Sequence, residues 1–293
     1  MGKSYQKQWT GVFGDPVDDN PTVVMEQAAF DAAGIPMEYL TIQVKKGDLE
    51  AAVQGMRAMN FTGINITMPH KGEVLQYLDE ISESARIMGA VNTVYWKNGK
   101  LAGENTDGKG FLKSIQDGEV PIKGKKAVIL GAGGAARAIA VELADAGIKT
   151  VTVINKNKAH GQALADIINT KTNAEGVFIP WENSVHIPED TDILINATPV
   201  GFTDDKKPDI VYEDMKAGMT VCDVIPNKAW TGFLLEAKEK GLRTFNGLQM
   251  LVNQGAIAFE LWTGEPAPVD VMREAMEKEY GVELFLEKVR KNT

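Results

Sequence analysis

Short apolar runs alternate with stretches of helical periodicity along the first part of the chain. Apolar runs bounded by turn residues predict strands at 9–14, 37–44, 63–67, 90–96 and 101–104. Apolar residues at helical spacing predict helices at 22–33 and 48–59, and another from Lys71. The Asn98-Gly99 pair is a strong signal for a hairpin. We therefore expect an α/β unit whose sheet is mostly parallel and carries a hairpin at one edge.

The alternation continues beyond residue 126 and ends in helices. Strands are predicted at 127–130, 150–154, 176–179, 192–195, 219–225 and 243–245. Helices are predicted at 160–169, 231–240, 248–262, 269–278 and 282–291. About six strands with helices between them are typical of a doubly wound parallel sheet. The predicted fold is α/β, with an N-terminal α/β domain, a Rossmann-type doubly wound domain and C-terminal helices.

A glycine-rich turn follows the strand at 127–130. It reads Gly131-Ala132-Gly133-Gly134-Ala135, and a helical apolar face begins at Ala136. Gly131 permits a tight turn, Gly133 lets the backbone approach a pyrophosphate, and the small Ala136 lets the helix pack close to the strand. The N-terminus of that helix offers free N–H groups to phosphates. The strand before and the helix after predict a dinucleotide-binding fingerprint rather than an ordinary glycine-rich loop.

The end of the next strand indicates which dinucleotide binds. An acidic residue there bonds the ribose 2′-hydroxyl of NAD, whereas basic residues accommodate the 2′-phosphate of NADP. The run Asn155-Lys156-Asn157-Lys158 contains lysine and no acid. We expect a preference for NADP, looser than an arginine would give because lysine lacks the planar fork, so NAD stays open as a second cofactor. A solvated basic turn is the alternative interpretation.

Composition and charge narrow the class of protein. The chain has 293 residues, a net charge of −9 and one cysteine, Cys222. The length suits about two domains, and an acidic chain without a basic stripe argues against nucleic acid and membrane as partners. A lone cysteine fits a reducing compartment, and neither a signal peptide nor a membrane-spanning run is present in the sequence. We expect a cytoplasmic protein, either a monomer or a homodimer.

Polar residues gather where the predicted strands of the first domain end, and ligands bind at such ends in open α/β sheets. Thr67 and Lys71 follow one strand, Asn92 interrupts the next, and Asp107 follows the hairpin, where Asn105-Thr106-Asp107 is expected to cap a helix beginning near Gly108. Taken singly, such residues are typical of turns and caps. Together, beside a nucleotide-binding domain, they favour a ligand site over a set of unrelated turns and caps.

The histidines show no metal-ligand spacing. His70, His160 and His186 are the only three histidines, and Cys222 stands apart from them. We therefore expect no metal. His70 adjoins Lys71 in the sequence and is expected to point away from it.

Six motifs occur in order along most of the chain. They are Asn65-Ile66-Thr67-Met68-Pro69-His70-Lys71, Gly89-Ala90-Val91-Asn92-Thr93, Asn105-Thr106-Asp107-Gly108, residues 131–138, Asn196-Ala197-Thr198-Pro199-Val200-Gly201 and residues 247–254. In this order they resemble the shikimate dehydrogenase family, which includes shikimate and quinate dehydrogenases. The resemblance implies a reversible NAD(P)-linked oxidation of a ring hydroxyl, as between shikimate and 3-dehydroshikimate. It also implies a small hydroxy acid as substrate and a place in aromatic amino acid biosynthesis.

The resemblance also implies roles for individual residues. It makes Lys71 and Asp107 the catalytic pair. The implied substrate contacts are Asn20, Thr22, Thr67, Asn92 and Gln254. The implied cofactor contacts are Gly131, Ala132, Gly133, Gly134, Ala135, Asn155, Lys156, Thr198, Val224, Gly247 and Met250. The implied domains are a substrate-binding domain at 1–107, a Rossmann NADP-binding domain at 108–246, and C-terminal helices at 247–293 that return to the substrate domain.

Three residues depart from the family pattern. Asn20 and Thr22 stand where the family has two serines that bind the substrate carboxylate, and Pro226 stands where it has a substrate-contacting tyrosine. Three interpretations stay open: a dehydrogenase of shikimate, quinate or a close relative; a dehydrogenase of another polyol or cyclitol; and a non-catalytic sensor that binds NADP. Lys71 and Asp107 argue against the sensor, because a sensor needs no pair for proton transfer.

Overall fold

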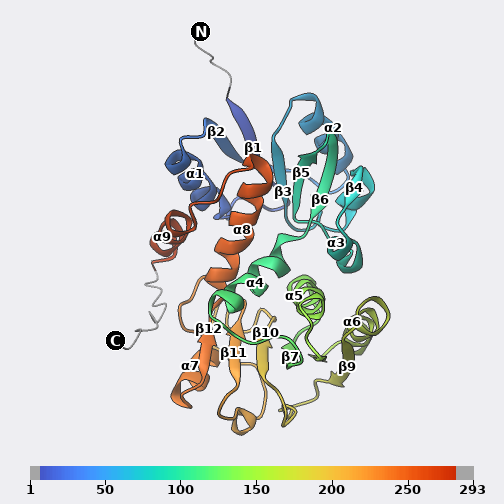
Figure 1. Ribbon diagram of the computed structural model, residues 1–293, viewed down its shortest axis with the longest axis vertical. Coiled ribbons are helices and arrows are strands. Elements are labelled where there is room, and N and C mark those ends of the chain that lie inside the picture. Colours follow the sequence, from blue (N-terminus) through green and yellow to red (C-terminus); the bar gives the residue numbers. More distant parts are fainter. Residues whose placement is uncertain (1–6, 282–293) are drawn as a thin grey trace.

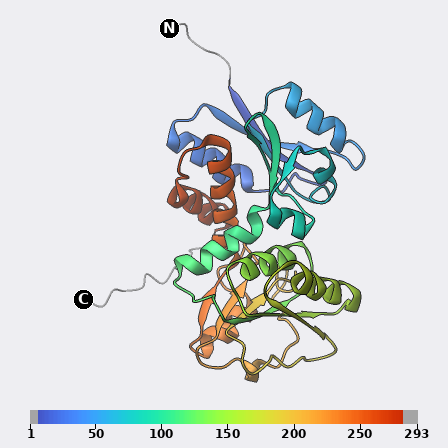
Figure 2. The same cartoon turned by 45° about the vertical axis from the view of Figure 1, so that its right-hand side comes forward.

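The chain folds around two six-stranded sheets, which lie one above the other along the long axis (Figure 1). The structure is a computed structural model, and it describes residues 7–281. Figure 2 shows the earlier part of the chain around the first sheet, the middle part around the second, and the red C-terminal helices back beside the first. No helix of the described residues is both long enough and apolar enough to cross a membrane.

The first sheet has the strand order β2-β1-β3-β5-β6-β4. Its strands are β1 (Gln8–Gly14), β2 (Met37–Gln43), β3 (Gly63–Ile66), β4 (Glu80–Ile81), β5 (Thr93–Lys97) and β6 (Lys100–Glu104). β1 runs parallel to β2 and β3, whereas β5 is antiparallel to β3 and β6. Its early helices are α1 (Thr22–Ala33), α2 (Leu49–Ala58), the 3-10 helix η1 (Glu73–Tyr77) and α3 (Glu83–Met88). Apolar clusters cover both faces of the sheet, as mostly parallel sheets require.

Two sequence expectations for this half need correction. The helix expected from Lys71 is only the short η1, because Arg57 on α2 pairs with Asp79 and bonds the carbonyl of Tyr77, while Leu101 N–H donates to Asp79 at 2.7 Å. These tertiary contacts draw the chain away from a continuing helix. The hairpin turn at Asn98-Gly99 is confirmed by positive φ at both residues, but the two-residue β4 lies outside β6 and forms the edge.

The second sheet has the order β12-β11-β10-β7-β8-β9, and every pairing in it is parallel. Its strands are β7 (Lys126–Leu130), β8 (Thr150–Asn155), β9 (Glu175–Pro180), β10 (Ile193–Asn196), β11 (Thr220–Asp223) and β12 (Arg243–Phe245). Its helices are α5 (Gly134–Asp145), α6 (Lys158–Lys171), η2 (Tyr212–Asp214) and α7 (Gly232–Glu239). This is the strand order of a doubly wound dinucleotide-binding fold. The predicted fold class is therefore confirmed.

Two helices, α4 (Thr106–Asp117) and α8 (Gly247–Thr263), connect the two sheets, and α9 (Val269–Tyr280) follows α8. α4 lies at the junction between α5 and α8 (Figure 1), and its small residues permit that approach. A Cβ on Gly108 would lie 2.4 Å from the carbonyl oxygen of Ala138 on α5, and one on Gly110 would lie 2.7 Å from the carbonyl oxygen of Met250 on α8.

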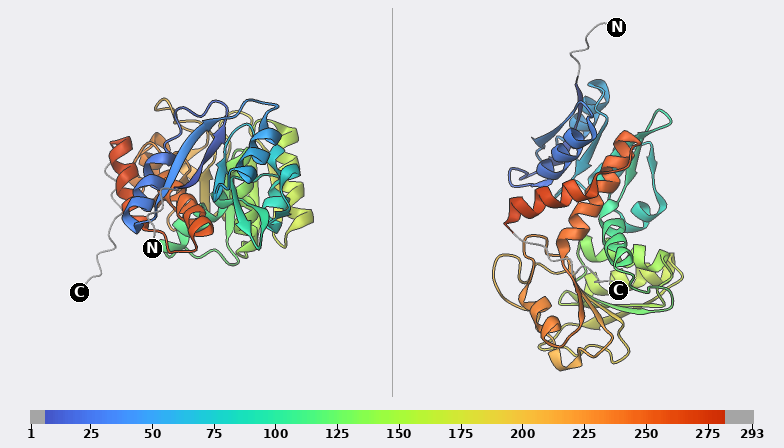
Figure 3. Two further views of the ribbon diagram at one scale, coloured as in Figure 1. Left: turned by 90° about the horizontal axis from the view of Figure 1, so that it is seen from above. Right: turned by 60° about the vertical axis from the view of Figure 1, so that its left-hand side comes forward.

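α8 and α9 run back to the first sheet, where they pack with α1 (Figure 3). Phe30 of α1 stacks on Phe259 of α8 at 5.3 Å between ring centroids. The helix predicted at 282–291 lies outside the described residues.

Candidate active site

A lysine and a carboxylate meet at the carboxyl ends of the first sheet's strands. Lys71 follows β3 after a tight turn, and Asp107 lies in the first turn of α4. Lys71 Nζ lies 2.6 Å from Asp107 Oδ2, and the two side chains are 27% and 21% exposed. This partial exposure leaves the pair reachable by a substrate and by solvent protons.

Asn105 holds the helix that carries Asp107. Its Oδ1 accepts the N–H of Asp107 at 3.1 Å, so α4 begins at Thr106, two residues earlier than expected, and Asp107 stands inside the first turn. A carboxylate at a helix N-terminus is stabilised by the free N–H groups and the helix dipole. Asn105 bonds the backbone N–H of Asp107, and the side chain of Asp107 pairs with Lys71.

Asn92 ties the pair to two other elements. Its Nδ2 donates to Asp107 Oδ1 at 2.9 Å and lies 3.4 Å from Gln254 Oε1 on α8, while its Oδ1 accepts the N–H of Thr106 at 2.7 Å. Each oxygen of Asp107 thus has its own donor, which fixes the carboxylate plane. The structure brings together Lys71, Asn92, Asp107 and Gln254, which come from four separate segments.

The remaining sequence-predicted substrate residues are Thr67, Asn20 and Thr22. Thr67 pairs through its N–H with Phe13 at the end of β1, and a Cβ on Gly14 would lie 2.4 Å from the Thr67 methyl carbon. Asn20 and Thr22 follow in the β1–α1 loop and the start of α1. Within residues 7–281, the side chains of Asn20 and Thr22 make no hydrogen bond to the Lys71 cluster. Asn20 Oδ1 accepts the N–H of Thr22 at 3.0 Å.

His70 is directed away from the pair, as expected. It is fully buried, and its Nε2 lies 2.6 Å from the carbonyl oxygen of Val44. Within residues 7–281, no group of three or more His, Cys, Asp or Glu side chains is arranged to hold a metal ion. The absence of a metal remains a prediction.

The glycine-rich turn faces the first domain across a small cavity of about 300 Å³. One wall is formed by Gly133, Gly134 and neighbouring residues of α5, and the other by Met88, Gly89 and Ala90. A Cβ on Gly133 or Gly134 would meet no atom within 4 Å, so the backbone there is open to a phosphate. Gly131 has φ +106 and thereby makes the tight turn out of β7. This local geometry fits a dinucleotide pyrophosphate at a helix N-terminus.

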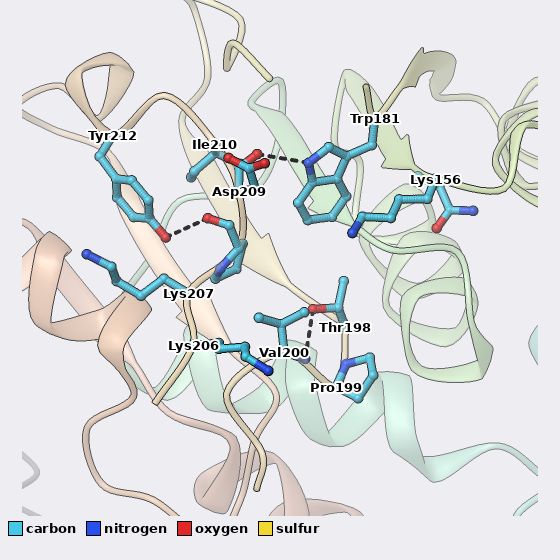
Figure 4. A pocket seen from close by; sticks show the side chains of 12 residues that line it. Lys156, Trp181, Thr198, Pro199, Val200, Lys206, Lys207, Asp209, Ile210 and Tyr212 are labelled. Atoms are coloured by element: carbon cyan, nitrogen blue, oxygen red, sulfur yellow. Dashed lines mark hydrogen bonds between the residues drawn. The ribbon is translucent and has the colours of Figure 1, made fainter. Parts of the chain in front are cut away.

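A larger cavity of about 790 Å³ adjoins the ends of β8 and β10. Asn155, Lys156 and Thr198, all predicted cofactor contacts, line it (Figure 4). Lys156 Nζ lies 5.6 Å from the ring centre of Trp181, within the range of a cation–π contact. The cavity has the apolar walls and the basic rim that an adenosine 2′-phosphate needs.

Two other predicted cofactor residues, Gly247 and Met250, are closely packed against the protein. Gly247 lies against the backbone of Val224, where a Cβ would come within 2.2 Å of the Val224 carbonyl oxygen. Met250 is only 8% exposed and packs in the core with residues of α4 and α5. Its side chain is therefore mainly part of the core.

Sequence reasoning missed several residues of these cavities. Trp181 follows β9 directly, and Lys206, Lys207 and Tyr212 lie in the chain after β10. The available signal was their position after the carboxyl ends of strands, where doubly wound sheets bind ligands. Arg137 was also missed; its Nη1 donates to the carbonyl of Met88 at 3.1 Å and so links α5 to the first domain.

A buried acid, Asp223, lies at the carboxyl end of a strand of the second sheet. Asp223 at the end of β11 accepts hydrogen bonds from Thr231 at 2.7 Å and from Asn196 at 3.2 Å. Burial raises the pKa of Asp223 to about 6, although these hydrogen bonds act in the opposite direction. The hydrogen bond from Asn196 to Asp223 links the ends of β10 and β11, which are followed by Thr198 and Val224.

Comparisons with known proteins agree with this architecture. Residues 12–94 match the model of the shikimate dehydrogenase substrate binding domain, residues 113–202 that of shikimate / quinate 5-dehydrogenase, and residues 247–277 that of the shikimate 5-dehydrogenase C-terminal domain. The chain is 42% identical to a shikimate dehydrogenase (NADP(+)) of Desulforamulus reducens over 277 residues, which cover 93% of this chain and 95% of that protein.

Solved structures are similar over the same length. A ligand-free 5-ketofructose reductase of Gluconobacter sp. strain CHM43 has a TM-score of 0.91 and 45% identity, covering 94% of this chain and all of that one. A shikimate 5-dehydrogenase from Listeria monocytogenes, in complex with shikimate and NAD, has a TM-score of 0.87 and 33% identity, covering 92% of this chain and 96% of that one.

A doubly wound sheet opposite a lysine–carboxylate pair on a second α/β sheet defines a two-domain dehydrogenase. Within that class, the chain belongs to the shikimate dehydrogenase family, as the three matching family models and the relative at 42% identity establish. The resemblance inferred from the sequence motifs is confirmed.

Proposed function

We propose that the protein is an NADP-dependent oxidoreductase that interconverts a ketone and a secondary hydroxyl by hydride transfer. The observation that carries this proposal is the contact of 2.6 Å between Lys71 Nζ and Asp107 Oδ2, where the chain leaves β3 and enters α4. NADP(H), when bound, supplies or accepts the hydride. The protein then has to bind the substrate, orient it and handle one proton.

Lys71 is the proposed acid and base at the reacting oxygen. In the direction of reduction, its ammonium donates a proton to the oxygen as that oxygen gains negative charge; in oxidation, its amine removes the hydroxyl proton. Asp107 Oδ2 holds the ammonium, and Asn92 fixes the other oxygen of the carboxylate at 2.9 Å. Gln254 and Thr67 are proposed to orient the substrate hydroxyls beside the pair. The partial exposure of Lys71 lets solvent restore its proton.

NADP is the proposed cofactor because of the residues at the end of β8. Lys156 lines the 790 Å³ cavity together with Trp181, and no acid follows β8 to bond a 2′-hydroxyl. The relative from Desulforamulus reducens is named an NADP(+) enzyme, whereas the Listeria structure holds NAD. NAD therefore stays in the proposal as a weaker second cofactor.

The family reaction, shikimate to 3-dehydroshikimate, is the reference substrate pair, with quinate or another cyclitol as alternatives. A ligand sensor without catalysis is disfavoured, because the Lys71–Asp107 pair is assembled with each carboxylate oxygen bonded. A sensor would gain nothing from a positioned proton donor.

Replacement of Lys71 tests the proposal. Lys71→Ala should lower kcat by about 10² or more, followed as the absorbance change of NADPH, while KM and NADPH binding change much less. Lys46→Ala is the matched control, since Lys46 is an exposed lysine in the chain after β2. Turnover by Lys71→Ala within a few-fold of the wild type would remove Lys71 from the mechanism.

Three coarser matters belong to the same proposal. We propose a cytoplasmic location, supported by the single buried Cys222. We propose domain boundaries at 107/108 and 246/247, supported by sheet strands that end at Glu104 and Phe245. A monomer or homodimer is proposed, and light scattering of the purified protein distinguishes the two.

A further inference from the structure

We propose that the part of the substrate site formed by Asn20 and Thr22 recognises an uncharged polyhydroxy ketone in preference to a carboxylate. The inference rests on the proposed hydride-transfer function and specifies its substrate class. It concerns the end of the site supplied by β1 and α1, beyond the Lys71–Asp107 pair.

This end of the site contains no positive charge of its own. Residues 8–44, which include β1, α1 and β2, contain no lysine, arginine or histidine. The ionisable residues near the start of α1 are acids, with Asp18 and Asp19 exposed in the loop and Glu26 buried in the helix. A carboxylate taken out of water needs a cation or several strong donors, and without them its desolvation is unfavourable.

The Asn20 side chain also occupies a backbone N–H group that could otherwise bind an anion. Its Oδ1 accepts the N–H of Thr22 at 3.0 Å, and this is one of the N–H groups left free by the start of α1. The groups that remain for a ligand are the Asn20 amide N–H and the Thr22 hydroxyl. The amide donates and the hydroxyl both donates and accepts, which suits substrate hydroxyl groups.

Glu26 places a carboxyl group one helical turn beyond Thr22. It is fully buried, and neither oxygen has a hydrogen-bond partner among the described residues. A Cβ on Gly255 would lie 2.8 Å from Glu26 Oε1, so this carboxyl group lies against the residue next to Gln254. Burial raises the pKa of Glu26 well above its usual range and so favours the neutral acid, which offers no positive charge to a substrate carboxylate.

The comparisons contain a relative with that kind of substrate. The solved structure at 45% identity and TM-score 0.91 is a reductase of 5-ketofructose, which is an uncharged ketone bearing several hydroxyls. The same reaction chemistry at Lys71 and Asp107 would serve both substrates, because the transferred proton goes to a carbonyl oxygen in each case.

Steady-state kinetics with NADPH test the inference. The kcat/KM of the wild-type protein is measured with 5-ketofructose and with 3-dehydroshikimate, and the reverse reaction with shikimate and quinate. We expect 5-ketofructose to be preferred over 3-dehydroshikimate by about 10² or more, because polar sites discriminate strongly against groups they do not match. Equal or better turnover of 3-dehydroshikimate overturns the inference and leaves the proposed function standing. No turnover of any of the four compounds overturns the proposed function itself.

Variants then test the residues assigned. The double variant Asn20→Ser, Thr22→Ser should lower kcat/KM for 5-ketofructose by about tenfold, mainly through KM, and raise that for 3-dehydroshikimate. Thr41→Ser, at an exposed position of β2, is the control and should change neither. An unchanged preference in the double variant contradicts the assignment.

Discussion

Gly110 lies where α4 passes close to the backbone of α8, and its replacement by alanine should disturb both stability and the site. A Cβ there would lie 2.7 Å from the carbonyl oxygen of Met250 and from the nitrogen of Gln254, against 3.4 Å for an ordinary contact. The helices must therefore separate by about 0.7 Å (3.4 − 2.7), or the alanine remains strained. Overpacking of this kind costs about 1–3 kcal/mol.

Gly55→Ala provides the matched control for this prediction. Gly55 lies inside α2, and the nearest atom to its added Cβ is the methyl of Met59 at 3.6 Å. Both substitutions gain about 1 kcal/mol of helix propensity, so the difference between them isolates the steric cost. Urea unfolding should show Gly55→Ala at or above wild-type stability and Gly110→Ala about 1–3 kcal/mol below Gly55→Ala.

Activity provides a second measurement on the same pair. Because Gln254 belongs to the displaced part of α8, Gly110→Ala should lower kcat/KM by about tenfold, whereas Gly55→Ala should not. If Gly110→Ala proved as stable and as active as Gly55→Ala, the close packing of α4 on α8 would not position the site, and the reasoning would fail.

Two further predictions concern the dinucleotide-binding half. Lys156→Ala should raise the KM for NADPH by about tenfold or more and leave that for NADH nearly unchanged, since a charge-assisted bond to the 2′-phosphate is worth about 1.5–3 kcal/mol; an equal change for both cofactors contradicts this role. Because burial raises the pKa of Asp223 to about 6, the folded state favours the protonated acid. Wild-type stability relative to Asp223→Asn should therefore fall by about 2–3 kcal/mol as pH rises from about 4 to about 7, and be level above that. Chemical denaturation across that range measures the difference, and a level or rising difference would contradict the pKa assignment.

Local patterns in the sequence were enough to predict the regular parts of the fold. α1 covers Thr22–Ala33 exactly where apolar spacing and Gly34 place it, and β7, the glycine-rich turn and α5 follow in the predicted order. These elements depend on periodicity and turn propensity, which neighbouring residues encode. The short β4 and α3 were missed because two and six residues are too few to show a period.

The candidate site was only partly open to the same reasoning. Lys71 and Asp107 follow the strands β3 and β6, and strand ends of one sheet meet at one edge, so their proximity could be expected. Asn92 directly precedes β5, which is antiparallel to β3, and therefore lies at the same edge. Gln254 could be assigned to the site only through the family resemblance, because it lies 162 residues from Asn92, the residue it approaches at 3.4 Å. Its position depends on α8 returning from the second sheet to pack on α1 and α4.

Tertiary structure alone decided the surroundings of the residues at the start of α1. The sequence shows asparagine, threonine and glutamate at 20, 22 and 26, but packing buries Glu26 without a hydrogen-bond partner among the described residues and turns Asn20 onto the N–H of Thr22. Likewise, only the fold places Trp181 beneath Lys156. Periodicity and turn chemistry act between near neighbours and are readable along the chain. Burial and hydrogen-bond partners arise between distant segments, and they exist only once helices and sheets have packed.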